Sequence, residues 1–181
     1  MSHLRDIAII GLIIYVVFTA FSPGNDGGPP EGQPAPDIQA SLMSGGTFTL
    51  SEHSGKVVIL DFWSTTCGPC RRSLPALQTV YEKVKDGGEV EIVSVSLDKG
   101  NRQQNPADVV TRYMKKNTLS FPVILDLQNA LASAYTVESI PTMVIIGPDG
   151  QVKHTAVGLY TTNHERLVQH IEQLIKQAQD S

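Results

Sequence analysis

Residues 57–70 read Val57-Val58-Ile59-Leu60-Asp61-Phe62-Trp63-Ser64-Thr65-Thr66-Cys67-Gly68-Pro69-Cys70, and this segment decides how the rest of the chain is interpreted. Its first seven residues are a continuous apolar run interrupted only by Asp61, which is typical of a strand buried on both faces of a sheet. Beyond the second cysteine, apolar residues recur at helical spacing, at Leu74, Leu77, Tyr81 and Val84, and the pattern ends at Gly87-Gly88. The cysteines are therefore expected where a buried strand gives way to a helix.

Cys67 and Cys70 are the only cysteines of the 181-residue chain. A cysteine at a helix N-terminus meets unpaired backbone N–H groups and the positive end of the helix dipole, and both favour the thiolate. Two intervening residues bring the second sulfur onto the same turn, close enough to attack a mixed disulfide formed at the first. Gly68 and Pro69 suit the tight start of the helix, because proline is tolerated in a first turn. The pattern indicates redox chemistry.

Two other uses of a cysteine pair are less compatible with the sequence. Half of a zinc site would need two further ligands, but there is no second cysteine pair, and the histidines are scattered singly. We expect solvent-facing or capping roles for four of the five histidines, which are His53, His154, His164 and His170. A purely structural disulfide is disfavoured because so small a loop constrains the unfolded chain little. We therefore expect no metal, and no cofactor beyond the redox-active disulfide Cys67–Cys70.

Two further features belong to the same candidate site. Asp61 interrupts an apolar strand six residues before Cys67. Burial there should raise the pKa of the carboxyl, which could then exchange a proton with Cys70; the alternative is an idle carboxylate hydrogen-bonded to backbone. Ile140-Pro141-Thr142 directly precedes an apolar strand, where proline is not ordinary ladder material. An unusual peptide geometry is expected at Pro141, with an ordinary trans turn as the alternative.

The remainder of residues 37–181 has the pattern of one folded domain. Hairpins are expected at 38–50 and 143–157, strands at 91–97 and 123–125, and a short helix at 130–135. A helix capped by Asn105 should turn Val109, Val110 and Tyr113 inward, and a capping box at Thr162–Glu165 should open a final helix. That final helix carries Leu167, Ile171, Leu174 and Ile175 on one side. Alternating strands and helices predict an α/β fold, a mostly parallel sheet covered on both faces with an antiparallel edge from the last hairpin.

The N-terminal part of the chain suggests a membrane segment followed by a linker. Residues 7–21 are apolar except for a glycine and a threonine, with no charge between Asp6 and Asp26. Residues 1–22 can be a signal peptide cleaved near Ala20-Phe21-Ser22 or an uncleaved signal-anchor. We prefer the anchor, because the cleavage site is imperfect and a long tether follows; a buried core helix would show a polar face. Residues 23–36 hold five of the eleven prolines, which predicts an extended spacer.

Composition excludes other classes of function. The chain has 14 lysines and arginines against 18 aspartates and glutamates, a net charge of −4. No basic surplus exists to bind phosphate backbones, so a nucleic-acid partner is not expected.

The residues that carry these features resemble a known family. Leu60–Trp63 followed by Cys67-Gly68-Pro69-Cys70 is similar to the active-site segment of thioredoxins, and Ile140-Pro141-Thr142 is similar to their cis-proline loop. The wider frame resembles the TlpA/ResA-type membrane-tethered thiol-disulfide oxidoreductases over roughly residues 34–178. The marks of that branch are the N-terminal apolar segment, Ala35-Pro36-Asp37 before a hairpin, Gly55-Lys56-Val57-Val58, an extra stretch at 97–120, Phe121-Pro122-Val123 and Gly147-Pro148-Asp149-Gly150.

The resemblance implies a thioredoxin fold, which is a central mixed sheet flanked by helices, with an N-terminal β-hairpin and a central insertion. It also implies that Cys67 attacks, that Cys70 resolves and that Pro141 is cis. A substrate groove is then formed by Trp63, Gly68, Pro69, Ile140 and Pro141. The implied protein reduces disulfides of exported proteins on the periplasmic side of the inner membrane, takes electrons from an integral-membrane thiol donor, and has cytochrome c maturation as a candidate task.

The sequence departs from this branch at three positions. Ser73 stands where many members place a glutamate, Asp61 where several have an uncharged residue, and Thr66 replaces an aromatic residue. Two rival functions stay open. A peroxiredoxin would have Pro and then Thr or Ser ahead of its cysteine, and here Leu60 occupies the proline position and Ser64 the other. A tethered protein-binding module would leave the cysteines idle.

Overall fold

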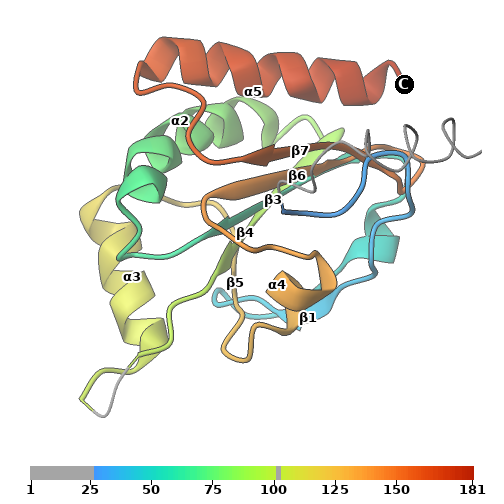
Figure 1. Ribbon diagram of the computed structural model, residues 1–181. Helices are drawn as coiled ribbons and strands as arrows, with labels where there is room; N and C mark the ends of the chain where they lie inside the picture. Colours follow the sequence, from blue (N-terminus) through green and yellow to red (C-terminus); the bar gives the residue numbers. More distant parts are fainter. Residues whose placement is uncertain (1–26, 101–102) are drawn as a thin grey trace, which may run out of the picture.

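The computed structural model describes residues 27–100 and 103–181 (Figure 1). The strands are β1 (Gln39–Ser41), β2 (Thr47–Thr49), β3 (Val57–Trp63), β4 (Val90–Ser96), β5 (Val123–Leu125), β6 (Thr142–Ile146) and β7 (Val152–Val157). The helices are α2 (Gly68–Val84), α3 (Pro106–Lys116), α4 (Ala130–Ala134) and α5 (His164–Gln179), with a 3-10 turn at Leu50–His53. The expected hairpins, strands and helices are all present.

The main sheet has the strand order β5-β4-β3-β6-β7, with β3 in the centre. β3 pairs parallel with β4 and antiparallel with β6. The sheet is therefore mixed, as the thioredoxin fold implies: β5, β4 and β3 run parallel, and the last hairpin, β6–β7, adds the expected antiparallel part beside β3. The reversal has a consequence for the site: the first residue of β6, Thr142, lies opposite Phe62 near the end of β3. The Ile140-Pro141 loop is thereby placed beside the cysteines.

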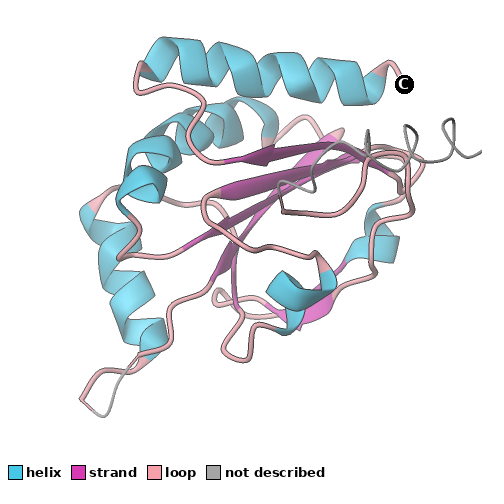
Figure 2. Cartoon of the chain, viewed as in Figure 1, coloured by secondary structure: helices cyan, strands magenta, loops and turns pink. Residues whose placement is uncertain are grey.

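Alternation along β3 divides the core into two layers, because successive side chains of a strand point to opposite faces. Val57, Ile59 and Trp63 enter the layer that contains residues of α2, α3 and α5. Val58, Leu60 and Phe62 enter the other layer, which contains residues of the N-terminal hairpin and α4. Figure 2 shows helices on both sides of the sheet, so the expectation that both faces are covered is confirmed.

The helix ends follow local capping chemistry. Asn105 caps α3, accepting the Ala107 N–H at 2.9 Å, as expected. In α3, Val110 and Met114 are the buried residues. The capping box expected from Thr162 is wrong by one residue: the side chain of Asn163 accepts the Arg166 N–H at 2.9 Å and so fixes the start of α5.

The Pro/Gly-rich stretch is part of the folded unit over its described residues, 27–36. Gly32 N–H donates to Val152 O at 2.7 Å, and Val152 N–H donates to Gln33 O at 2.9 Å. The stretch thus lies along the outer edge of β7. Prolines are tolerated there because an edge segment needs hydrogen-bond donors on one side only. The extended-spacer interpretation is wrong for these residues.

The proposed signal-anchor or signal peptide, residues 1–22, lies outside the described residues. Within the described ranges, no helix is both long enough and apolar enough to cross a membrane.

Candidate active site

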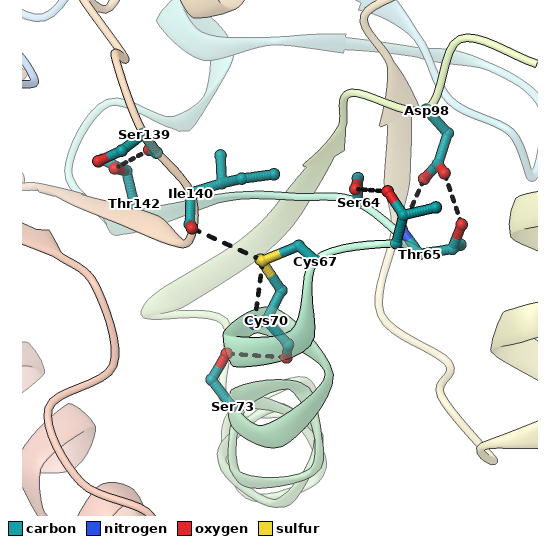
Figure 3. Close-up of a disulfide and its surroundings, with 10 residues drawn as sticks. Ser64, Thr65, Cys67, Cys70, Ser73, Asp98, Ser139, Ile140 and Thr142 are labelled. Carbon is teal, nitrogen blue, oxygen red and sulfur yellow. Dashed lines mark hydrogen bonds between the residues drawn. A yellow bond between two sulfur atoms is a disulfide. The ribbon is translucent and has the colours of Figure 1, made fainter.

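The two cysteines form a disulfide at the first turn of α2, with their Cα atoms 5.3 Å apart (Figure 3). Cys67 is the N-cap residue, and its sulfur accepts the backbone N–H of Cys70 at 3.1 Å. The pair is asymmetric in exposure, since Cys67 is half-buried and Cys70 is fully buried. Only the sulfur of Cys67 can therefore attack a large substrate or be attacked by one.

A loop from the start of β6 lies against the cysteines. The Ile140–Pro141 peptide bond is cis, as the resemblance implied. The carbonyl oxygen of Ile140 lies 3.6 Å from the sulfur of Cys67. The loop is tied on both sides: the Thr142 hydroxyl donates to Ser139 O at 2.7 Å, and Gly158 N–H donates to Pro141 O at 2.8 Å.

Asp61 is buried in the same core layer as Cys70. By strand alternation its side chain shares the face of Ile59 and Trp63, and it is only 2% exposed. Burial raises the pKa of the Asp61 carboxyl to about 8, because the charged form is poorly solvated there. Its Oδ2 atom has no hydrogen-bond partner among the described residues. The alternative of a carboxylate satisfied by backbone is therefore wrong for this oxygen.

A small cavity of about 40 Å³ adjoins Asp61 and connects it with Ser73 and Pro141. A volume of this size accommodates on the order of two or three water molecules. The Ser73 hydroxyl donates to the Cys70 carbonyl at 3.0 Å, so Ser73 occupies the turn directly beyond the buried cysteine. The other lining residues are Met143, Ala156, Gly158, Leu159, Tyr160, Leu167, His170, Ile171 and Leu174.

Comparisons with known proteins agree with this geometry. Residues 31–155 match the model of the AhpC/TSA family. The chain is 32% identical to the thiol-disulfide oxidoreductase ResA of Geobacillus kaustophilus over 93% of this chain and 89% of the relative. It is 31% identical to ResA of Bacillus subtilis, over 97% and 92% respectively. This chain belongs to the AhpC/TSA family, among relatives of ResA.

Solved structures of relatives show the same fold. A Chlorobium tepidum protein assigned as the thiol:disulfide interchange protein DsbE has a TM-score of 0.68 and 30% identity, over 81% of this chain and 98% of that one. StoA from Bacillus subtilis has a TM-score of 0.61 and 26% identity, over 80% and 97%. The fold is thioredoxin-like, and this ResA relative is a thiol-disulfide oxidoreductase.

The residues expected to form the groove do not all reach the surface. Gly68 and Pro69 are exposed beside Cys67, and Ile140 is half-buried. Pro141 is buried. Trp63 is wrong as a groove residue: it is 0% exposed, because it lies on the inner face of a central strand. Its ring lies 5.5 Å from that of Tyr113 of α3, so it packs in the core layer that also contains Cys70.

The histidines contact different parts of the domain. His53 stacks on Phe48, and His170 stacks on Tyr160. His154 lies 2.9 Å from Glu31. Within the ranges that the structure describes, no grouping of three or more His, Cys, Asp or Glu residues is arranged to hold a metal ion.

One polar residue of the site was missed in the sequence. Asp98 lies just beyond β4, is 7% exposed, and accepts hydrogen bonds from Thr65, which precedes the cysteines (Figure 3). The available signal was weak: an aspartate directly after a strand that pairs parallel with β3. Without the pairing, nothing in the sequence connects residue 98 with residue 65.

Proposed function

We propose that the protein is an extracytoplasmic disulfide reductase in which Cys67 attacks, Cys70 resolves and Asp61 exchanges a proton with Cys70. The observation that carries this proposal is the asymmetry of the pair. Cys67 sits partly exposed at a helix N-terminus, while Cys70 lies buried in the layer that also holds the Asp61 carboxyl. This arrangement separates an accessible nucleophile from a protected resolving thiol.

The reaction starts from the reduced pair. The Cys67 thiolate attacks a substrate disulfide, forming a mixed disulfide and releasing one substrate sulfur as a thiolate, which takes a proton from solvent. Cys70 then gives its proton to the Asp61 carboxylate and attacks the Cys67 sulfur. The mixed disulfide breaks, the second substrate sulfur leaves as a thiolate and is protonated, and the Cys67–Cys70 disulfide remains. Two electrons move from the enzyme dithiol to the substrate, and no cofactor beyond this disulfide is needed.

Asp61 suits the proton step because burial raises its pKa to about 8. An acid with a pKa close to the working pH can both take up and release a proton there, which is what exchange with Cys70 requires. Many members of the branch that the sequence resembles carry a glutamate where this chain has Ser73, and here Asp61 provides the acidic group of the site.

The remaining groove residues act on substrate position. Gly68 and Pro69 leave the approach to Cys67 open, and the Ile140 carbonyl lies 3.6 Å from its sulfur. Pro141 is buried and lines the cavity that adjoins Asp61. An extended substrate segment could therefore lie between the start of α2 and the Ile140 loop.

Location and electron supply rest on the N-terminal segment. The apolar run at 7–21 supports export or anchoring, and an oxidising compartment requires that the disulfide be reduced again from outside it. An integral-membrane thiol donor would supply these electrons. Similarity to ResA supports cytochrome c maturation as a task for the reductase.

The test is trapping of substrates with Cys70→Ser. This variant keeps Cys67 but cannot resolve, so mixed disulfides should accumulate in cells and appear as higher-mass species on non-reducing gels. Cys67→Ser is the matched control and should trap none. Absence of trapped species with both variants would favour the binding-module alternative.

Direction is tested by the reduction potential. A reductase should equilibrate near thioredoxin, about −270 mV, while a value near about −120 mV would make the protein an oxidant and overturn the proposed direction.

A further inference from the structure

The turn between β3 and α2 is held by a carboxylate from the neighbouring strand. Leu97 N–H donates to Trp63 O at 2.8 Å, where the two strands end. Two residues farther along, Thr65 N–H donates to Asp98 Oδ2 at 2.9 Å, and the Thr65 hydroxyl donates to Oδ1 at 2.5 Å. The Asp98 side chain thus continues the pairing after the two backbones diverge.

Asp98 is itself fixed. The Ser96 hydroxyl donates to Asp98 Oδ2 at 2.9 Å, and Asp98 N–H donates back to the Ser96 oxygen at 3.3 Å. Three donors therefore converge on one buried carboxylate, and hydrogen bonds to a charged acceptor are among the stronger ones in proteins. Because these bonds hold the Asp98 carboxylate in place, it fixes the position of Thr65.

The position of Thr65 determines the position of Cys67. Cys67 N–H donates to Ser64 O at 3.2 Å and closes a tight turn in which Thr65 is a central residue. The hydroxyl groups of Ser64 and Thr66 lie 3.0 Å apart across the same turn. In Figure 3, Asp98 and Ile140 lie on opposite sides of Cys67, so the turn is held on one side and the sulfur faces the loop on the other.

We propose that Asp98 is a positioning residue for Cys67: its carboxylate fixes the Ser64–Cys67 turn so that the Cys67 sulfur accepts the Cys70 N–H. The inference rests on the proposed role of Cys67 as the attacking thiolate. In the reduced protein that N–H, 3.1 Å from the sulfur in the disulfide form, stabilises the thiolate. Asp98 acts through Thr65 and does not touch the reacting atoms.

The test measures alkylation of the reduced full-length protein by iodoacetamide as a function of pH, with mass spectrometry to locate the modified cysteine. In Asp98→Ala, Thr65 N–H loses its acceptor and the turn loosens. Alkylation of Cys67 at pH 7 should fall about five- to tenfold, with the midpoint of the profile moved to higher pH. Asp98→Asn keeps an oxygen that can accept Thr65 N–H, so it should stay within about twofold of wild type.

A matched control is Asp126→Ala. Asp126 is also a buried aspartate beyond a strand end, and it accepts the Ala132 N–H at 2.8 Å without touching Thr65. Its loss should lower the melting temperature and leave the alkylation midpoint in place. Should Asp98→Ala not fold, Thr65→Val removes only the hydroxyl bond and should raise the midpoint by a smaller amount.

Two results would overturn the inference, and a third would refute the proposed function on which it rests. An unchanged midpoint in Asp98→Ala, or in Thr65→Val where Asp98→Ala does not fold, would mean that the carboxylate only stabilises the fold. A lower midpoint in both Asp98 variants would mean that Asp98 acts through its charge. If Cys67→Ser still reduced disulfides, the proposed function would be refuted. Because Asp98 is intact in this variant, that result is distinguishable from a failure of the inference about Asp98.

Discussion

Replacement of Asp61 by asparagine should stabilise the oxidised protein, and the gain should grow with pH. Asp61 has a pKa of about 8 in the folded protein, raised by burial, against an ordinary value of 3.8. The folded state therefore keeps a proton on this carboxyl over a pH range in which the unfolded chain has lost it. The contribution of Asp61 to the free energy of unfolding is therefore greatest below about pH 4, and it falls progressively as the pH rises to about 8.

The size of the effect follows from the same linkage. Each pH unit inside that window changes the free energy of unfolding by about 1.4 kcal/mol per proton. Between pH 5 and pH 8, wild type should lose about 4 kcal/mol relative to Asp61→Asn, and above pH 8 the difference should level off. The cysteines do not contribute to this difference, because they are joined in a disulfide in both proteins.

The assay is guanidinium unfolding of both proteins at pH 5, 6, 7, 8 and 9 without reductant. The quantity of interest is the difference in unfolding free energy, since contributions from all other titrating groups cancel. The Asp61→Asn variant brings an amide N–H₂ into the cavity, which shifts the whole curve by a constant. A difference that varies by less than about 1 kcal/mol over pH 5–8 would show that the pKa of Asp61 is not raised, and the proton-transfer role would lose its basis.

The remaining predictions concern activity and packing. Asp61→Asn should slow insulin reduction at least tenfold and abolish the rise in wild-type rate as pH passes about 8, as measured by turbidity under a constant supply of reductant. Tyr135→Phe should cost about 1–2 kcal/mol in chemical denaturation, since the Tyr135 hydroxyl donates to Pro36 O at 2.6 Å; an unchanged midpoint would mean that this bond adds nothing. Gly28→Ala should destabilise the protein by about 1–3 kcal/mol, because Gly28 has φ +107° and an added Cβ would collide with Thr155 Cγ2. An unchanged free energy of unfolding would mean that packing of the N-terminal stretch does not contribute to the stability of the domain.

Several features of the site could be predicted because they depend on residues close together in the sequence. The spacing of Cys67 and Cys70 at a strand-to-helix junction predicted the N-cap position that the structure confirms. The single acid in an apolar strand predicted burial of Asp61 and the direction of its pKa change. Both are local consequences of secondary structure, which the apolar period determines.

The errors arose where tertiary pairing overrides local pattern. The family resemblance placed Trp63 in the groove, but strand alternation turns its side chain into the core. The Pro/Gly composition of residues 27–36 predicted a spacer, while the open edge of β7 supplies hydrogen-bond partners that composition does not reveal.

The sequence by itself determined the chemistry of this protein, because a Cys-x-x-Cys pair at a helix start favours a thiolate wherever that helix lies. Only the tertiary structure decided which groups surround the pair. The antiparallel placement of β6 brings Ile140 to the sulfur, and the parallel placement of β4 brings Asp98 to Thr65. These contacts join residues 73 and 33 positions apart, and such distances are set by sheet order, which local periodicity does not encode.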